Sequence, residues 1–86
     1  MTREAIRDKV LQVLGQIAPE ADLEALDPKQ DLREQLDLDS MDFLHFALGL
    51  NEGFGLDVPE RDYPKMSTIE DCITYLWQRS ASPRQR

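Results

Sequence analysis

Hydrophobic residues near the N-terminus follow a helical period. They recur at steps of one, three or four positions at Ile6, Val10, Val13, Leu14 and Ile17. This spacing is typical of an amphipathic helix that buries one face. Thr2 can cap the start of such a helix, and Pro19 can end it. We therefore expect a helix between these two residues.

The pattern lapses between Pro19 and Leu38. Prolines and many acidic residues interrupt the apolar positions Leu23, Leu26, Leu32, Leu36 and Leu38. A link of about 20 residues is unusually long for a compact domain. We expect the leucines to hold it against the core, or the link to have a function of its own.

A second helix is predicted from Ser40 to Gly53. Either Asp39 or Ser40 can cap its start, and Gly53 with Gly55 can close it. At about 100° per residue, one side of this helix collects Phe43, Phe46, Ala47, Leu50 and Phe54. That side should pack into the core.

The same helix carries a second apolar stripe on another side. Met41, Leu44 and Leu48 follow one another at steps of three and four, beside His45 and Glu52. A helix in so small a protein can hardly bury both sides. We therefore expect the second stripe to stay exposed.

Two further helices are predicted downstream. Pro59 can start a short turn over Glu60–Tyr63, which Pro64 would limit. Ser67 and Glu70 then have the spacing of a capping box, with Ser67 as the N-cap. A last helix follows with apolar residues at helical spacing, namely Ile69, Cys72, Ile73 and Leu76.

Together these patterns predict an all-α fold. It would have three longer helices and a short third helix, with a long loop between the first and second. The chain of 86 residues and 9.9 kDa is one domain by length. From Ser80 the sequence has no periodicity, and we expect residues 80–86 to form a flexible basic tail.

Charge narrows the range of partners. The chain has 17 acidic and 10 basic residues, a net charge of −7. Three of the basic residues, Arg79, Arg84 and Arg86, lie among the last eight positions. An acidic body repels phosphate backbones, so nucleic acids and anionic membranes are poor partners, whereas basic protein surfaces are attracted.

Cysteine usage and hydropathy bear on the compartment. Cys72 is the only cysteine, which excludes an internal disulfide and a multi-cysteine zinc site. The apolar run from Phe43 to Leu50 is far shorter than a membrane span of about 20 residues. The N-terminus lacks the apolar core of a signal peptide. We expect a monomeric protein of the reducing cytoplasm that does not insert into membranes.

Metal binding and hydrolysis are poorly supported. Asp37, Asp39 and Asp42 cluster, but an EF-hand loop beginning at Asp37 would need different residues at three of its positions, among them a glycine at Asp42. Ser40 and His45 would lie about 140° apart around a helix, so they do not suit a catalytic triad. Cys72 is interpreted as a packing residue. We expect no catalytic residue and no metal site.

Ser40 is the most informative residue. It lies at a predicted helix N-terminus, where free backbone N–H groups and the helix dipole can stabilise an attached phosphate. This is a favourable position for a covalent phosphodiester. The alternative is that Ser40 is an ordinary N-cap.

Three motifs then resemble the acyl carrier proteins. The sequence Asp39-Ser40-Met41-Asp42 matches their D-S-(hydrophobic)-D box. It is followed at the family's spacing by Phe54-Gly55-Leu56-Asp57-Val58-Pro59 and by Met66-Ser67-Thr68-Ile69. The resemblance covers about residues 3 to 78 of the chain.

The resemblance implies a four-helix bundle over residues 1–79 that carries acyl groups and is not an enzyme. A separate phosphopantetheinyl transferase would attach 4′-phosphopantetheine from coenzyme A to Ser40, and Asp39 would help to position magnesium and substrate in that complex. The terminal thiol of the arm would hold acyl groups as thioesters. The phenylalanine side of the second helix would wall a core able to open around an acyl chain.

The second helix would also be the face that partners contact. Acyl-loading and acyl-processing enzymes with basic docking surfaces would bind the apolar stripe and its acidic border. The residues implied are Asp37, Met41, Asp42, Leu44, His45, Leu48 and Glu52.

Some residues depart from the pattern of the housekeeping fatty-acid carriers. His45, Gly49, Asn51 and Gly53 stand where those carriers typically have several glutamates. This favours a specialised carrier in fatty-acid, polyketide or a related specialised pathway. Two alternatives remain: an aminoacyl or peptidyl carrier, and an unmodified acidic helical adaptor.

Overall fold

The computed structural model describes residues 1–81 and is entirely helical within that range. Its elements are α1 (Arg3–Ile17), η1 (Leu23–Ala25), α2 (Leu32–Leu36), α3 (Ser40–Phe54), η2 (Glu60–Met66) and α4 (Ile69–Ala81). The predicted all-α fold with a long loop before the second main helix is confirmed. None of the described helices is long and apolar enough to cross a membrane.

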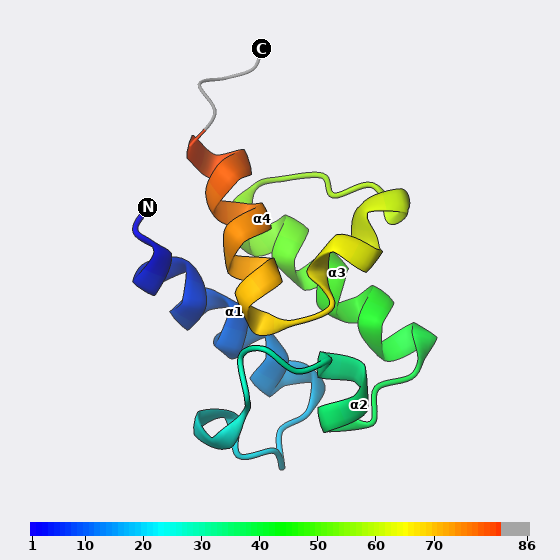
Figure 1. Cartoon of the computed structure of the whole chain (residues 1–86). Coiled ribbons are helices and arrows are strands. Elements are labelled where there is room, and N and C mark those ends of the chain that lie inside the picture. Colours follow the sequence, from blue (N-terminus) through cyan, green and yellow to red (C-terminus); the bar gives the residue numbers. More distant parts are fainter. Residues whose placement is uncertain (82–86) are drawn as a thin grey trace.

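Helix α1 forms where the apolar period predicts it. The Thr2 hydroxyl accepts a hydrogen bond from the Ala5 N–H, as expected of an N-cap. Four side chains on its inner face are buried: Ile6, Val10, Leu11 and Leu14. Helix α1 packs against both α3 and α4, and these three helices surround the core (Figure 1).

The long link contains two short elements that periodicity did not predict, η1 and α2. Asp31 caps α2 by accepting from the Glu34 N–H. The link crosses the end of the bundle where α4 begins (Figure 1). There the Leu32 N–H donates to the Ser67 carbonyl at 2.8 Å, and the Glu70 N–H donates to the Pro28 carbonyl at 3.0 Å.

The leucines hold this link to the core, as predicted. Leu32 is fully buried and Leu38 is nearly so, while the other three pack against the core at partial burial: Leu23, Leu26 and Leu36. Burial of these side chains compensates part of the entropy lost by ordering so long a loop.

Helix α3 buries its predicted side. Phe43, Phe46, Ala47 and Leu50 are buried and Phe54 is half-buried. The helix runs one residue beyond Gly53, to Phe54. Gly55 ends it with φ +65°, a left-handed conformation that favours glycine.

The helical turn η2 differs from its prediction. We expected Pro64 to limit it, but the turn continues to Met66 with Pro64 inside. The fixed φ of proline fits a 3₁₀ turn, and in a turn this short the missing N–H removes at most one internal bond.

Helix α4 is capped by a different residue from the one predicted. Thr68 Oγ1, and not Ser67, accepts from the backbone N–H three residues on, that of Asp71, at 2.9 Å. Ser67 has helical dihedrals, which do not suit an N-cap. Its hydroxyl instead donates to the Pro64 carbonyl at 3.1 Å. The predicted capping box of Ser67 and Glu70 is therefore wrong.

The inner face and the C-terminal end of α4 can be compared with the predictions. Its inner face buries the apolar residues predicted for it, namely Ile69, Cys72, Ile73 and Leu76. Burial raises the pKa of the Cys72 thiol, which suits a packing residue. The helix includes Ser80 and Ala81, the first residues of the expected tail, and residues 82–86 lie outside the described part.

Candidate functional site

Ser40 is the first residue of α3, and it is exposed. The residue before it, Asp39, is the N-cap. Asp39 Oδ1 accepts from the Asp42 N–H at 2.8 Å, and Asp42 Oδ2 accepts from the Asp39 N–H at 3.2 Å. This reciprocal capping box fixes the backbone on both sides of Ser40.

The interpretation of Ser40 as the N-cap is therefore wrong. Within residues 1–81 the Ser40 hydroxyl makes no hydrogen bond, because Asp39 satisfies the backbone donor that a cap serves. The first N–H groups of a helix have no intrahelical acceptor, and those of Ser40 and Met41 lie beside this hydroxyl. The position combines a free nucleophilic oxygen with the positive end of a helix dipole.

A groove of about 600 Å³ begins at Ser40 and runs between α3 and η2. We call it the Ser40 groove. Its apolar lining comprises Met41, Phe43, Leu44, Tyr63 and Pro64. The Phe43 ring meets Tyr63 edge-on, with ring centroids 5.7 Å apart, and meets Phe46 in the same manner at 5.6 Å. The groove therefore offers apolar contact area over a floor of packed aromatic rings.

Arg33 and Glu60 are charged residues that line the same groove. Arg33 is its one basic residue, and its Nε donates to the Leu38 carbonyl at 3.5 Å. Asp39 and Asp42 place negative charge next to Ser40, so a phosphate bound there would need a cation nearby. Among the residues that line the groove, Arg33 is the one that can supply it.

The second apolar stripe of α3 is exposed, as predicted. Met41 is 57% exposed and Leu48 is 50% exposed. Leu44 is half-buried because it also lines the Ser40 groove. The charged and polar residues assigned to this face are exposed at Asp37, His45 and Glu52 and half-buried at Asp42.

The three aspartates do not converge on a metal site. No group of three His, Cys, Asp or Glu side chains among residues 1–81 could hold a metal ion. Asp37 ends α2 with φ +54°, whereas Asp39 and Asp42 cap α3. These carboxylates thus have separate structural roles.

A family model described as the phosphopantetheine attachment site matches residues 4–76. The chain belongs to this carrier family. The curated acyl carrier protein of Rubrobacter xylanophilus is 29% identical over 73 residues, which cover 81% of this chain and 90% of the relative. That of Campylobacter hominis is 34% identical over 73 residues, covering 85% and 86%.

Solved structures agree on the fold. An acyl carrier protein structure from Enterococcus faecalis superposes with a TM-score of 0.75 at 23% identity, covering 91% of this chain and 98% of that one. The predicted membership, the carrier function and the 4′-phosphopantetheine cofactor are confirmed at the level of the family.

The candidate site at Ser40 includes residues that the sequence analysis did not identify. Arg33, Glu60 and Tyr63 come to Ser40 through the fold, from α2 and η2. No spacing in the sequence marks them. Tyr63 belongs to the predicted short helix, and Arg33 lies in a link whose helix is too short to produce a period.

Proposed function

We propose that Ser40 is the residue of this carrier that receives 4′-phosphopantetheine. The supporting observation is that Ser40 is exposed and that its hydroxyl is free, because Asp39 caps the helix in its place. With a separate transferase, Ser40 Oγ would attack the pyrophosphate of coenzyme A. A new phosphoester bond forms, the pyrophosphate bond breaks, adenosine 3′,5′-bisphosphate leaves, and the hydroxyl proton passes to a base.

The residues around Ser40 fit this group. The N-terminus of α3 and the Arg33 guanidinium would stabilise the phosphate. Phe43 and Tyr63 would contact the pantetheine arm along the Ser40 groove. When bound, the group supplies a thiol that holds acyl groups as thioesters.

Asp39 retains a carboxylate oxygen for a partner. Its Oδ1 accepts the capping bond, and within residues 1–81 its Oδ2 accepts none. We assign Oδ2 to the magnesium and substrate of the transferase complex. Both roles of Asp39 are compatible because they use different oxygens.

We propose that the exposed stripe on α3 is the docking face for acyl-loading and acyl-processing enzymes. Met41 and Leu48 supply apolar area, and the acidic residues around them attract basic surfaces. The docking residues proposed are Asp37, Met41, Asp42, Leu44, His45, Leu48 and Glu52. The chain would act as a carrier domain over residues 1–79, without catalysis of its own, as a monomer in the cytoplasm.

A specialised pathway is supported by α3 itself. Its central and C-terminal parts carry His45, Gly49, Asn51 and Gly53 and one acidic residue, Glu52. Fewer charges weaken electrostatic steering toward enzymes that select strongly acidic carriers. We place the carrier with dedicated partner enzymes in fatty-acid, polyketide or related lipid chemistry.

Intact mass tests the attachment. The protein is incubated with coenzyme A, magnesium and a broad-specificity phosphopantetheinyl transferase, together with the Ser40→Ala and Ser67→Ala variants. Ser67 lines the same groove and is the matched control. We expect the mass of one phosphopantetheine to be added to the wild type and to Ser67→Ala, and none to Ser40→Ala.

A folded wild-type protein that no transferase modifies would contradict the proposal. The acidic adaptor would then explain the exposed stripe, and its binding to basic proteins would survive Ser40→Ala. Loading by an amino-acid-activating enzyme in preference to acyl ligases would instead identify an aminoacyl or peptidyl carrier.

A further inference from the structure

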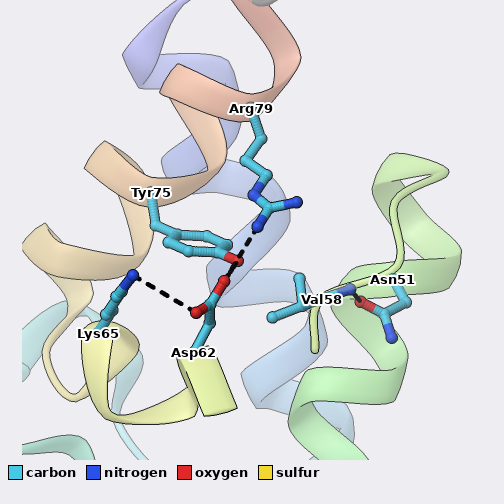
Figure 2. Close-up of polar contacts among 6 residues, drawn as sticks. All are labelled: Asn51, Val58, Asp62, Lys65, Tyr75 and Arg79. Atoms are coloured by element: carbon cyan, nitrogen blue, oxygen red, sulfur yellow. Dashed lines mark hydrogen bonds and ion pairs between the residues drawn. The ribbon is translucent and has the colours of Figure 1, made fainter. Parts of the chain in front are cut away.

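Asp62 in η2 is the one charged residue that is buried among residues 1–81, at 6% exposure. Three groups surround its carboxylate (Figure 2). The Tyr75 hydroxyl donates to Oδ2 at 2.5 Å, and Arg79 Nη2 donates to the same oxygen at 3.0 Å. Lys65 Nζ lies 3.4 Å from Oδ1. We call these four residues the Asp62 cluster.

The Asp62 cluster joins η2 to α4. Asp62 and Lys65 belong to η2, whereas Tyr75 and Arg79 lie one turn apart on α4. The Arg79 guanidinium also stacks over the Tyr75 ring, 4.8 Å from its centroid. The carboxylate therefore meets a preorganised donor pair on a rigid helix.

Tyr63, the residue after Asp62, faces α3. The Tyr63 ring packs on Phe43 of α3 and lines the Ser40 groove together with Glu60 and Pro64. Thus η2 has one side fixed to α4 and another side that forms the wall of the groove. Any movement of η2 relative to α4 would move that wall.

A second contact holds the end of η2 to α4. The Cys72 thiol donates to the carbonyl of Met66, the last residue of η2, at 3.3 Å. Both side chains are fully buried. Cys72 is thus a native reporter, since separation of η2 from α4 would give its thiol access to solvent.

We propose that Asp62 is a positioning residue for the Ser40 site: it fixes the η2 wall of the Ser40 groove onto α4. A buried carboxylate that accepts two hydrogen bonds from α4 ties the two elements together, because separating them would leave that carboxylate without these donors. This proposal rests on the proposed function only for the identity of the group that occupies the groove. The coupling itself is a property of the unmodified protein.

The first experiment measures opening of η2. Unmodified wild type, Asp62→Asn and Tyr75→Phe are treated with 5,5′-dithiobis(2-nitrobenzoic acid), and the labelling rate of Cys72 is followed over a series of low urea concentrations. Tyr75→Phe removes the donor and keeps the ring. Asp57→Asn is the control, because it makes the same change of charge at an exposed residue near η2.

We expect both cluster variants to label about tenfold faster than wild type, with little dependence of the rate on urea, as for a local opening. Asp57→Asn should label like wild type. If labelling in the cluster variants is unchanged, or follows the steep urea dependence of global unfolding, Asp62 contributes only general stability and the proposal is overturned.

The second experiment measures the consequence at Ser40. At a temperature where every variant is folded, the KM and kcat of a transferase are measured with each protein as substrate. We expect KM to rise about threefold or more in Asp62→Asn and Tyr75→Phe while kcat stays within about twofold, because the capping box at Ser40 is untouched. An unchanged KM despite faster Cys72 labelling would also overturn the proposal.

The two proposals fail in different ways. If no variant and no wild-type protein is loaded, the proposed attachment at Ser40 is wrong. Amide exchange at Tyr63 and Cys72 labelling then still decide whether Asp62 positions the groove wall: protection at Tyr63 that is lost in Asp62→Asn and kept in Asp57→Asn supports it, and protection equal in both contradicts it.

Discussion

Gly49 of α3 lies directly against Val13 of α1. A Cβ placed on Gly49 would lie 2.7 Å from Val13 Cγ1, closer than real side chains approach. The glycine thus permits a close approach of α3 to Val13 of α1 at this point. From the sequence Gly49 is only a residue that weakens a helix, whereas the structure shows that it permits close packing of α1 and α3.

This contact predicts opposite effects of two alanine substitutions. Gly49→Ala should lower the free energy of unfolding, because overpacking against a stiff valine costs about 1–3 kcal/mol, more than the gain of up to about 1 kcal/mol in helix propensity. Gly53 has no atom within 4 Å of its added Cβ. Gly53→Ala should therefore raise the free energy of unfolding by about 0.5–1 kcal/mol.

Urea unfolding monitored by circular dichroism measures both variants. Val13→Ala combined with Gly49→Ala is the informative control, because it removes the obstructing methyl groups. If Gly49→Ala is as stabilising as Gly53→Ala, then α1 and α3 have room to separate and the close approach is not required.

The capping box at Ser40 predicts which side chain stabilises α3. Asp39→Ala should cost about 1 kcal/mol of stability, because it removes the acceptor of the Asp42 N–H. Ser40→Ala should change stability by less than about 0.5 kcal/mol, since the serine caps nothing. Thermal or urea melts of both variants, with Ser67→Ala as a control, test this order, and the reverse order would restore Ser40 as the cap.

The long helices could be predicted from the sequence because their burial follows a single period. Ile6, Val10 and Leu14 of α1 and Phe46 and Leu50 of α3 are all fully buried as the pattern required. Helices α2 and η1 are shorter than two turns, so they show no period. Leu32 is buried where its backbone N–H donates to the Ser67 carbonyl, a contact between distant segments that no local pattern contains.

The candidate site was predictable only in part. Ser40 and Asp39 lie in one short motif, so sequence alone could find them. Arg33 and Tyr63 reach the groove from α2 and η2, and the partners of Asp62 lie on α4, where Tyr75 donates to its carboxylate. Contacts of this kind depend on how elements pack and not on the spacing of residues.

Asp62 predicts a loss of stability in acid. The hydrogen bond from Tyr75 lowers the pKa of Asp62 below its usual value of 3.8; burial opposes this, and Lys65 and Arg61 add to the lowering. The folded state therefore binds this proton more weakly than the unfolded state does. The contribution of Asp62 is complete above pH 4 or so and is lost as the pH falls below it.

Urea unfolding of wild type and Asp62→Asn between about pH 2.5 and 7 checks this sign. The difference in stability between the two proteins should be constant at neutral pH and shrink below about pH 4. Asp57→Asn provides the comparison for a general change of charge. A difference that grows as the pH falls would mean that the Asp62 carboxylate is destabilising in the folded protein.

Ionisation of Tyr75 predicts a loss of stability in alkali. Burial, together with the hydrogen bond to Asp62, raises the pKa of Tyr75 to about 12, although Arg79 lowers it. Because the folded value lies above the ordinary value of 10.0, the contribution of Tyr75 is intact below pH 10 and is lost toward pH 12. Absorbance at 295 nm follows ionisation, and the difference between wild type and Tyr75→Phe isolates this group.

The Asp62→Asn variant tests whether the Asp62 carboxylate raises the pKa of Tyr75 in that titration. Without the neighbouring carboxylate the pKa of Tyr75 should fall below its wild-type value, while burial, the larger cause, still raises it; circular dichroism checks that the variant is folded. Ionisation of Tyr75 near pH 10 in the wild type would show that its hydroxyl is not held by Asp62.

Substitutions in the exposed stripe on α3 should weaken partner binding without unfolding the protein. Met41 and Leu48 are half or more exposed, so replacing both by alanine should change the free energy of unfolding by less than about 0.5 kcal/mol each. If partner enzymes bury these side chains, the KM of loading should rise about tenfold. Trp77→Ala is the control, since Trp77 is also exposed and apolar but belongs to α4.

Salt separates the two components of docking. Acidic residues around the stripe attract basic partners over distances that salt screens, whereas apolar contact does not weaken in this way. The double variant should therefore keep the salt dependence of wild-type KM, and Glu52→Gln should reduce that dependence with a small effect at high salt. If Trp77→Ala raises KM as much as the double variant does, partners bind the α4 side and the docking face on α3 is wrong.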